Sequence, residues 1–288
     1  MPIDLPKITM RQKEILDLLY KHRFLNRIQI QALLDQKDYK NTNLWLKDLR
    51  EKHYVEWIYS THFAEKTKPA VYYLGINAIR RFRQIGTHEG YILKYYREST
   101  RSQAFIDRCI LLADACTAFK QTNKTIGTVD RMAKSDDVWF MYETEAEFTE
   151  AGYYEFLNDT DIHPNLCYTK MGYDDYFEEV PVASYTVEVF DPTLPRYSMR
   201  KRLKNYVQFL DGEEWQDEME EEKPPIALFV CPTKADMIYC KRVTRKLLED
   251  AWGTENIHMR FTMVESIKKH GFRGKIWEEV ALPVDDDK

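Results

Sequence analysis

Apolar residues near the start of the chain recur at helical spacing. Ile15, Leu18 and Leu19 fall on one stripe of a helix. Thr9 precedes this stripe and Gln12 follows Thr9 by three residues, which is the spacing of a capping box. The pattern predicts a first helix that begins just after Thr9.

Two further helices are predicted before the first β-type residues. Asn26 is placed to cap a short second helix. The apolar positions of this helix are Ile28, Ile30, Leu33 and Leu34. After a break at residues 35–38, a third helix is expected over about residues 39–53, with Leu46 and Leu49 as its core pair.

Two short β-type runs follow, at residues 54–59 and 70–74, and a closing helix is expected over 77–85. The polar segment between the two runs contains Lys66 and Lys68. Three helices followed by a hairpin with a basic loop is the element order of a winged helix-turn-helix. This order predicts a winged helix in the first hundred residues.

The third helix carries polar residues that lie away from its apolar pair. These residues are Lys40, Asn41, Asn43 and Lys47. A helix fits a major groove about 12 Å wide, where Asn can pair with adenine and Lys can reach guanine or phosphate. We therefore expect these four residues to bind duplex DNA, with Lys66 and Lys68 on the neighbouring backbone.

Two alternatives to this DNA interface remain open at the level of sequence. The winged helix could bind a protein, with its polar residues simply solvated. Asn43 could instead make a local hydrogen bond near the start of its helix.

The rest of the chain alternates strands with helices. A junction is expected at residues 98–102, followed by an amphipathic helix over about 102–121. Strand-like runs occur at 138–142, 166–168, 185–190, 226–230 and 257–263, and helices are expected at 196–210 and 234–252. The predicted organisation is a winged helix over 1–98 and an α/β domain over 99–288, with an overall α+β or α/β class.

Charge is distributed unevenly between these two parts. Residues 1–102 carry 19 Lys and Arg against 11 Asp and Glu, a net charge of +8. Residues 103–288 carry 23 against 36, a net charge of −13. A basic first part beside an acidic second part favours a first part that meets a polyanion, with chance segregation of surface charge as the alternative.

Composition narrows the range of functions. The five cysteines are scattered and form no C-x-x-C pair, which is typical of buried thiols in a reducing cytoplasm. No signal peptide and no membrane helix is expected. The sequence has no Gly-rich phosphate loop and no recognisable Ser-His-Asp or Cys-His signature.

The second part has the chain order of a restriction-endonuclease-like core. Such cores place a carboxylate before a strand that carries Glu-x-Lys, and the two carboxylates hold Mg²⁺. Here the strand offers Glu188, but Phe190 stands where the Lys belongs and Asn165 where the Asp is expected. The nuclease signature is therefore incomplete.

Other residues could complete it in displaced positions. The carboxylate candidates are Asp161, Asp174, Asp175 and Asp191, and the amine candidates are Lys201 and Lys204. Of these we name Asp191 and Lys204, with Glu188, as candidate catalytic residues, and Glu188 as the candidate metal ligand. The alternative is that Glu188 is a partner for the basic cluster at 200–204; Mg²⁺ is expected only for an active nuclease, and otherwise no cofactor.

The chain resembles the replication-relaxation family of plasmids and integrative elements in Gram-positive bacteria. The resemblance rests on Thr9-Met10-Arg11-Gln12, Ile15-Leu16, His22-Arg23-Phe24-Leu25, Leu46 with Leu49, Val71-Tyr72-Tyr73-Leu74, Val187-Glu188-Val189, Arg202-Leu203-Lys204-Asn205-Tyr206, Leu228-Phe229-Val230 and Pro232-Thr233. It implies a winged helix joined to a nuclease-like domain that assists plasmid replication or conjugative relaxation. The departures at Asn165 and Phe190 count against nuclease activity and leave DNA binding untouched.

The leading hypothesis is therefore a non-enzymatic, cytoplasmic DNA-binding protein of a mobile element. Its partners would be double-stranded DNA, a relaxase or replication protein, and a second copy in a homodimer, with no membrane. The alternatives are a Mg²⁺-dependent nuclease with a displaced active site and a plain transcriptional regulator.

Overall fold

The chain folds into two units that both combine helices and strands, which confirms the predicted α+β class. The computed structural model describes residues 4–59, 68–87, 89–126, 137–150, 162–212, 215–216, 223–250 and 256–280. Division by contacts gives one unit over Met1–Thr117 and a second over Ala118–Lys288. Because such a division does not test where an independent domain ends, the boundary predicted at residues 98 and 99 stays a prediction.

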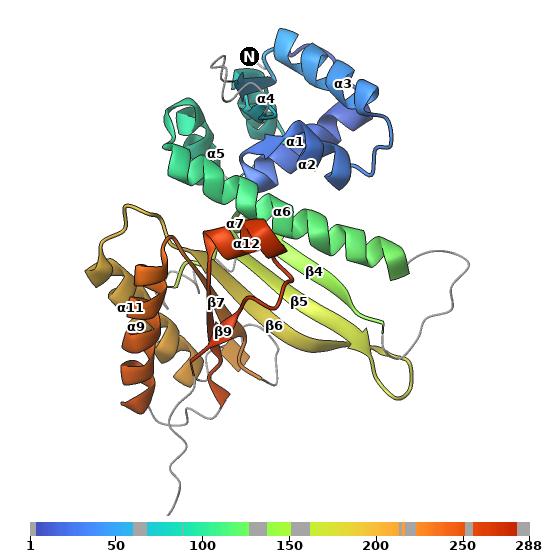
Figure 1. Cartoon of the computed structure of the whole chain (residues 1–288). Coiled ribbons are helices and arrows are strands. Elements are labelled where there is room, and N and C mark those ends of the chain that lie inside the picture. The colour runs from blue at the N-terminus through green and yellow to red at the C-terminus, as the bar shows by residue number, and fades with distance from the viewer. Residues whose placement is uncertain are drawn as a thin grey trace, which may run out of the picture. The chain divides into compact units, whose positions relative to one another are not determined.

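The first unit contains several helices (Figure 1) and a small antiparallel sheet. Its elements are α1 (Met10–His22), β1 (Leu25–Asn26), α2 (Arg27–Leu33), α3 (Tyr39–Glu51), β2 (Val55–Ile58), β3 (Val71–Leu74), α4 (Ile76–Gln84), α5 (Glu89–Ile92), the 3₁₀ helix η1 (Leu93–Thr100) and the first part of α6 (Gln103–Ile126). The strands lie in the order β1-β3-β2. Three helices followed by a β2–β3 hairpin is the element order predicted from the sequence.

Capping boxes define the starts of α1 and α2. The backbone N–H of Gln12 donates to the Thr9 hydroxyl at 3.3 Å, and the Thr9 N–H donates to the Gln12 side chain at 2.8 Å. Asn26 and Gln29 exchange the same two bonds at 3.0 Å each. Each box satisfies donors that the first turn of a helix leaves open. The predicted cap residues Thr9 and Asn26 are confirmed.

The predicted apolar face of α2 is wrong at one position. Ile30 and Leu33 are buried, whereas Ile28 is 56% exposed. Because successive residues turn by about 100°, Ile28 and Ile30 lie on nearly opposite sides of the helix. In such a short helix only one of these two positions reaches the core.

A buried ion pair connects distant segments of the first unit. Glu98 is fully buried at the end of η1 and accepts from Arg23, whose Nε lies 3.2 Å from Glu98 Oε1. Arg101 Nε lies 3.8 Å from the same oxygen. The Arg23 guanidinium also lies 4.5 Å from the ring centre of Phe105. The segment predicted as a junction at residues 98–102 therefore contributes a buried residue to this unit.

The second unit is built on a six-stranded mixed sheet in the order β4-β5-β6-β7-β8-β9 (Figure 1). Its elements are the end of α6, β4 (Trp139–Thr144), α7 (Glu145–Glu150), β5 (Leu166–Tyr173), β6 (Glu179–Val189), α9 (Arg196–Asp211), β7 (Ile226–Cys231), α11 (Lys234–Glu249), β8 (Met259–Met263), α12 (Val264–His270) and β9 (Glu278–Glu279). The pairs β6–β7 and β7–β8 are parallel and the other pairs are antiparallel. Strands β5 and β6 extend beyond the runs predicted for them.

The two faces of this sheet carry different aromatic clusters. Glu188 of β6 lies beside Phe229 of β7 in the sheet. Side chains of such paired residues point to the same face of the sheet. Helices α9 and α11 pack on this face, over a core that includes Phe190 and Phe229. On the opposite face Phe119 of α6 contacts Tyr168 of β5, with ring centres 4.7 Å apart. The sheet of the second unit is thus covered on both faces.

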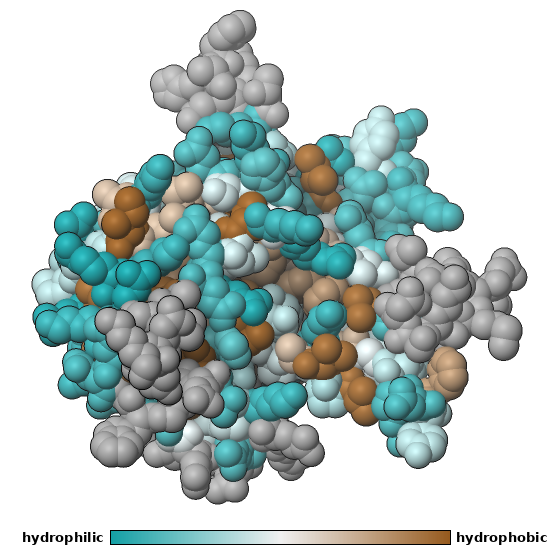
Figure 2. All heavy atoms as spheres, turned by 60° about the horizontal axis from the view of Figure 1, so that its bottom comes forward, coloured by the Kyte–Doolittle hydropathy of each residue, from teal (hydrophilic) through white to brown (hydrophobic). Residues whose placement is uncertain are grey.

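Cysteines and hydrophobic residues occupy the positions expected of a globular chain. All five cysteines are described and none forms a disulfide, and four of them are buried. Among the described residues no helix is both long enough and apolar enough to cross a bilayer. On the face drawn in Figure 2, hydrophobic residues form small separate groups among hydrophilic ones.

We expect Glu98→Ala to destabilise the first unit strongly. The substitution leaves the buried Arg23 guanidinium without its carboxylate partner, and removing one member of a buried pair costs about 3–5 kcal/mol. Urea unfolding of the full chain, followed by circular dichroism, measures the change. Glu51→Ala is the matched control, because its exposed pair with Lys47 contributes at most about 0.5 kcal/mol. Equal unfolding midpoints for the two variants would contradict the role of Glu98.

Candidate nucleic-acid interface

The predicted recognition residues lie on the exposed side of α3. Thr42, Leu46 and Leu49 form its buried side, which confirms the predicted core pair. The side chains on the exposed side include Lys40, Asn41, Asn43, Leu44 and Lys47. Lys40, Asn43 and Lys47 are spaced i, i+3 and i+7, so they form one stripe along the helix, and Asn41 lies at its edge. One element thus presents all four predicted residues.

The start of α3 leaves the side chains of Lys40 and Asn43 available for a ligand. Asp38 caps the helix by accepting from the backbone N–H of Lys40 at 2.8 Å. The side chain of Asn43 makes no hydrogen bond with any residue that the structure describes. The capping role therefore falls to Asp38, and the structure gives no support to a local hydrogen-bonding role for Asn43.

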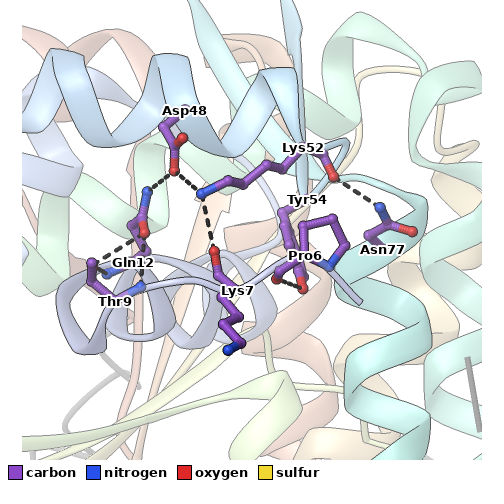
Figure 3. A network of polar contacts seen from close by, with 8 residues as sticks. All are labelled: Pro6, Lys7, Thr9, Gln12, Asp48, Lys52, Tyr54 and Asn77. Carbon is purple, nitrogen blue, oxygen red and sulfur yellow. Dashed lines mark hydrogen bonds and ion pairs between the residues drawn. The ribbon is translucent and has the colours of Figure 1, made fainter. Parts of the chain in front are cut away.

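A polar network holds the inner side of α3 against α1 (Figure 3). The Gln12 amide donates to Asp48 Oδ2 at 2.5 Å, and the Lys52 ammonium donates to the same oxygen at 2.7 Å. Gln12 thus caps α1 with its carbonyl oxygen and binds α3 with its amide nitrogen. This second role of Gln12 was not visible in the sequence, because 36 residues separate Gln12 from Asp48.

The same network reaches the segment before α1 and the start of α4 (Figure 3). The Lys52 ammonium also donates to the Lys7 carbonyl at 3.0 Å, and the Tyr54 hydroxyl donates to the Pro6 carbonyl at 2.6 Å. Asn77 at the start of α4 donates to the Lys52 carbonyl at 2.8 Å. The C-terminal end of α3 is therefore held from several directions.

Lys52 also sets the charge state of Asp48. The hydrogen bond from its ammonium lowers the pKa of the Asp48 carboxyl below the ordinary 3.8, against the opposite effect of partial burial. The bond from Gln12 lowers this pKa further. Asp48 therefore keeps its negative charge toward lower pH than an isolated aspartate would.

The β2–β3 hairpin presents an exposed aromatic group beside α3. Trp57 of β2 is 40% exposed, and the Arg50 guanidinium of α3 lies 3.5 Å from its ring centre. Tyr59 stacks on Trp57 with ring centres 5.5 Å apart. Of the two predicted wing lysines, Lys68 is described and exposed, whereas Lys66 lies outside the described residues. Arg50 and Trp57 are additions that the sequence pattern did not single out.

The residues at the nuclease-like positions 165, 188 and 190 make structural contacts in the second unit. Glu188 is 1% exposed and accepts from Arg202 of α9, so the alternative role of Glu188 as a partner of the basic cluster is confirmed. Phe190 is buried and stacks on Phe229, with the two ring centres 5.6 Å apart. The Asn165 side-chain oxygen accepts from the Val189 backbone at 2.8 Å. Side chains that would hold Mg²⁺ in a nuclease are here bonded to the protein itself.

Asp191 and Lys204, the two displaced candidates named from the sequence, are described by the structure, whereas Asp161 lies outside the described residues. Asp191 accepts from the backbone and hydroxyl of Thr193, at 2.8 and 2.6 Å, and Lys204 lies on the exposed side of α9.

Burial raises the pKa of the Tyr206 phenol, and the negative charge of Glu188 raises it further. Within the described ranges no three His, Cys, Asp or Glu side chains are grouped so that they could hold a metal ion.

Comparison with known proteins assigns the chain to a family. The model of a family described as replication-relaxation matches residues 16–222, which is most of the chain. The chain belongs to the replication-relaxation family. This family indicates a role in the replication or relaxation of plasmids and mobile elements. Searches among curated proteins and among solved structures give no significant match.

We expect Asp48→Asn to reduce the acid sensitivity of this replication-relaxation protein. A carboxyl whose folded pKa is lowered stabilises the fold above its unfolded pKa of about 3.9, and this contribution is lost as pH falls through the folded pKa. The pair with Lys52 is partly exposed, so its contribution is at most about 1 kcal/mol. Urea midpoints near neutral pH and near pH 3 should differ less for Asp48→Asn than for the natural chain, whereas an Asp4→Asn control should behave like the natural chain. Identical acid sensitivity in all three would refute the contribution of this pair.

Proposed function

We propose that the first unit is a winged helix that docks α3 in the major groove of duplex DNA. The binding serves replication or relaxation of a plasmid or mobile element. The observation that carries the proposal is the stripe of Lys40, Asn43 and Lys47 on the outer side of α3. The inner side of the same helix is packed and hydrogen-bonded to α1. A recognition helix needs this combination, because base-edge contacts require a rigid support.

The charge of the first part of the chain supports the same ligand. Residues 1–102 carry a net charge of +8, although the whole chain carries −5. DNA releases bound counterions when Lys and Arg neutralise its phosphates, and binding therefore weakens steeply with salt. A protein partner would be a poorer match, because it would need an acidic surface of comparable charge. It would also offer no base edges for the asparagines on α3 to contact.

The hairpin supplies the second contact in this proposal. Lys68 and Lys66 belong to the connection between β2 and β3, and they would lie over the phosphates next to the groove that α3 occupies. Arg50 is held over the Trp57 ring near the end of α3, where a fixed guanidinium can contact phosphate. Asn41 and Asn43 would then read adenine, and the lysines would contact guanine or phosphate.

The second unit completes the proposal as the part that recruits partners. We propose a relaxase or a replication protein, or a second copy of the chain, as its partner. Its likeness to a restriction-endonuclease-like core remains an interpretation of its chain order. Location of the bound DNA separates this function from plain transcriptional regulation: a site at a replication or transfer origin supports the proposal, and a site confined to the chain's own promoter favours a regulator.

We expect Lys40→Ala with Lys47→Ala to weaken DNA binding about tenfold or more and to reduce the salt slope by about 2, because each phosphate contact contributes roughly 0.9 to that slope. Fluorescence anisotropy of the full chain on a labelled duplex, repeated at several salt concentrations, measures both. The control variant is Arg80→Ala with Arg97→Ala, which removes the same charge from exposed positions on α4 and η1. If both double variants lose the same affinity, charge alone explains binding and α3 is not the recognition helix.

Asn41→Ala and Asn43→Ala should change base preference more than overall affinity. Each bidentate contact discriminates against the wrong base by about 1–3 kcal/mol, and the loss is confined to the base pair that it reads. Selection of bound duplexes from a random pool should therefore show relaxed preference at one position for each variant. Unchanged preferences in both variants would mean that α3 contacts only the backbone.

A further inference from the structure

Helix α9 presents a stripe of cations in a unit that is otherwise acidic. Its exposed side chains include Arg196, Tyr197, Arg200, Lys201 and Lys204. Arg196, Arg200 and Lys204 are spaced by four residues, so they lie on one side of the helix about 6 Å apart along its axis. The opposite side, with Met199 and Leu203, is buried in the core of the second unit.

Helix α11 presents a similar stripe. Its exposed side chains include Lys234, Ile238, Arg242, Arg245 and Lys246. Together α9 and α11 contain ten Lys and Arg against three Asp and Glu, a net charge of +7. The remainder of the second unit, residues 118–288, has 12 against 31, a net charge of −19. The cations of this unit are therefore concentrated on two helices.

Tyr239 joins the two stripes into one surface. Helices α9 and α11 pack beside each other on one face of the sheet (Figure 1). Tyr239 of α11 donates from its hydroxyl to the Arg196 carbonyl at 3.3 Å. The guanidinium of Arg196 lies 5.0 Å from the Tyr239 ring centre, and that of Arg242 lies 5.9 Å from it. Cations from both helices thus meet at one aromatic ring, which restricts their motion.

Several of these cations form no ion pair with the part of the chain that the structure describes. Two of them form ion pairs: Arg196 Nε lies 3.6 Å from Asp236 Oδ1, and Lys241 Nζ lies 2.6 Å from Glu278 Oε2. In contrast, Arg200, Lys204 and Arg245 form no ion pair with any described residue. Exposed like charges gathered on one surface repel each other, so their concentration favours an anionic ligand.

We propose that the exposed side of α9 and α11, here called the α9–α11 surface, binds the phosphate backbone of duplex DNA. A duplex carries about one charge per 1.7 Å of axis, so it can meet cations repeated along two adjacent helices. Arginine guanidinium groups also match phosphate oxygens in bidentate geometry. An anionic membrane fits less well, because α9 and α11 bury their apolar sides in the core and membrane-surface helices insert theirs into lipid.

The contact with bases assigned to α3 and the contact with phosphates assigned to this surface are separate. The proposal extends the proposed function, since it rests on duplex DNA being the ligand of this chain. It does not depend on α3 being the recognition helix. The two surfaces can therefore be tested independently in the full chain.

The test is anisotropy of the full chain on a labelled duplex of arbitrary sequence at several salt concentrations. The surface variant carries Arg200→Gln, Lys204→Gln, Arg242→Gln and Arg245→Gln. We expect its affinity to fall about tenfold or more, and its salt slope to become shallower by about 3–4, as expected for four lost phosphate contacts. These side chains are exposed, so the circular dichroism spectrum should be unchanged.

The matched control removes four exposed lysines of the second unit that lie outside α9 and α11. It carries Lys223→Gln, Lys268→Gln, Lys269→Gln and Lys275→Gln. We expect this control variant to bind DNA with an affinity within about twofold of the natural chain's and to keep its salt slope. If the surface variant unfolds, Arg200→Gln with Arg245→Gln is measured against Lys268→Gln with Lys269→Gln. Equal losses in surface and control variants would overturn the proposal.

The remaining outcomes separate this proposal from the function of α3. Loss of binding in the surface variant alone supports the α9–α11 surface and refutes α3. Loss of binding only in Lys40→Ala with Lys47→Ala supports α3 as the DNA-binding element and refutes the α9–α11 surface. A natural chain that binds no duplex refutes both. Vesicles of phosphatidylserine and phosphatidylcholine provide the last test: if the surface variant loses binding to vesicles but keeps its affinity for DNA, the ligand is a membrane and the proposal is wrong.

Discussion

The orientation of α3 depends on the side chain of Gln12. Its carbonyl oxygen caps α1, and its amide donates to Asp48 on α3 at 2.5 Å. A side chain fixed at one end by a capping box has little rotational freedom left to lose at the other. The bond to Asp48 therefore costs less conformational entropy than one from a freely rotating glutamine. In this way the start of α1, together with the packing of Leu46 and Leu49, helps to fix the direction in which the exposed stripe of α3 points.

Local signals in the sequence predicted α1 to α4 and the β2–β3 hairpin of the first unit, whereas β1, α5 and η1 were not predicted. The capping boxes of Thr9 with Gln12 and of Asn26 with Gln29 each join residues three positions apart. Leu46 and Leu49 have the spacing of about one helical turn. Pairs such as Arg23 with Glu98 are 75 residues apart and leave no periodic trace in the sequence. The predicted junction at residues 98–102 contains Glu98 for this reason, since a Glu in a polar segment carries no sign of burial. Local periodicity identifies the helices, whereas long-range polar pairs become visible only in the fold.

Glu188 illustrates the same limit for the candidate chemistry. A glutamate in a strand fits both a metal ligand and a structural partner, and the residue two positions later decides between them. In this chain that residue is Phe190, which lies in the aromatic core against Phe229. The neighbouring helix supplies Arg202, which is partly exposed and neutralises the buried carboxylate. The pair itself contributes little net stability, but the buried carboxylate would be costly without its arginine. This accounts for a glutamate in the core without invoking catalysis.

Electrostatics connect the two proposed surfaces. Outside α9 and α11, residues 118–288 carry a net charge of −19, and this charge repels a polyanion. DNA near such a chain is steered away from most of the second unit and toward the positively charged parts. Because the repulsion falls off over about 10 Å at moderate salt, an acidic region limits nonspecific contact without cancelling attraction at a cationic surface. If duplex DNA is the ligand as proposed, the acidic majority and the concentrated cations act together and favour DNA bound in few orientations.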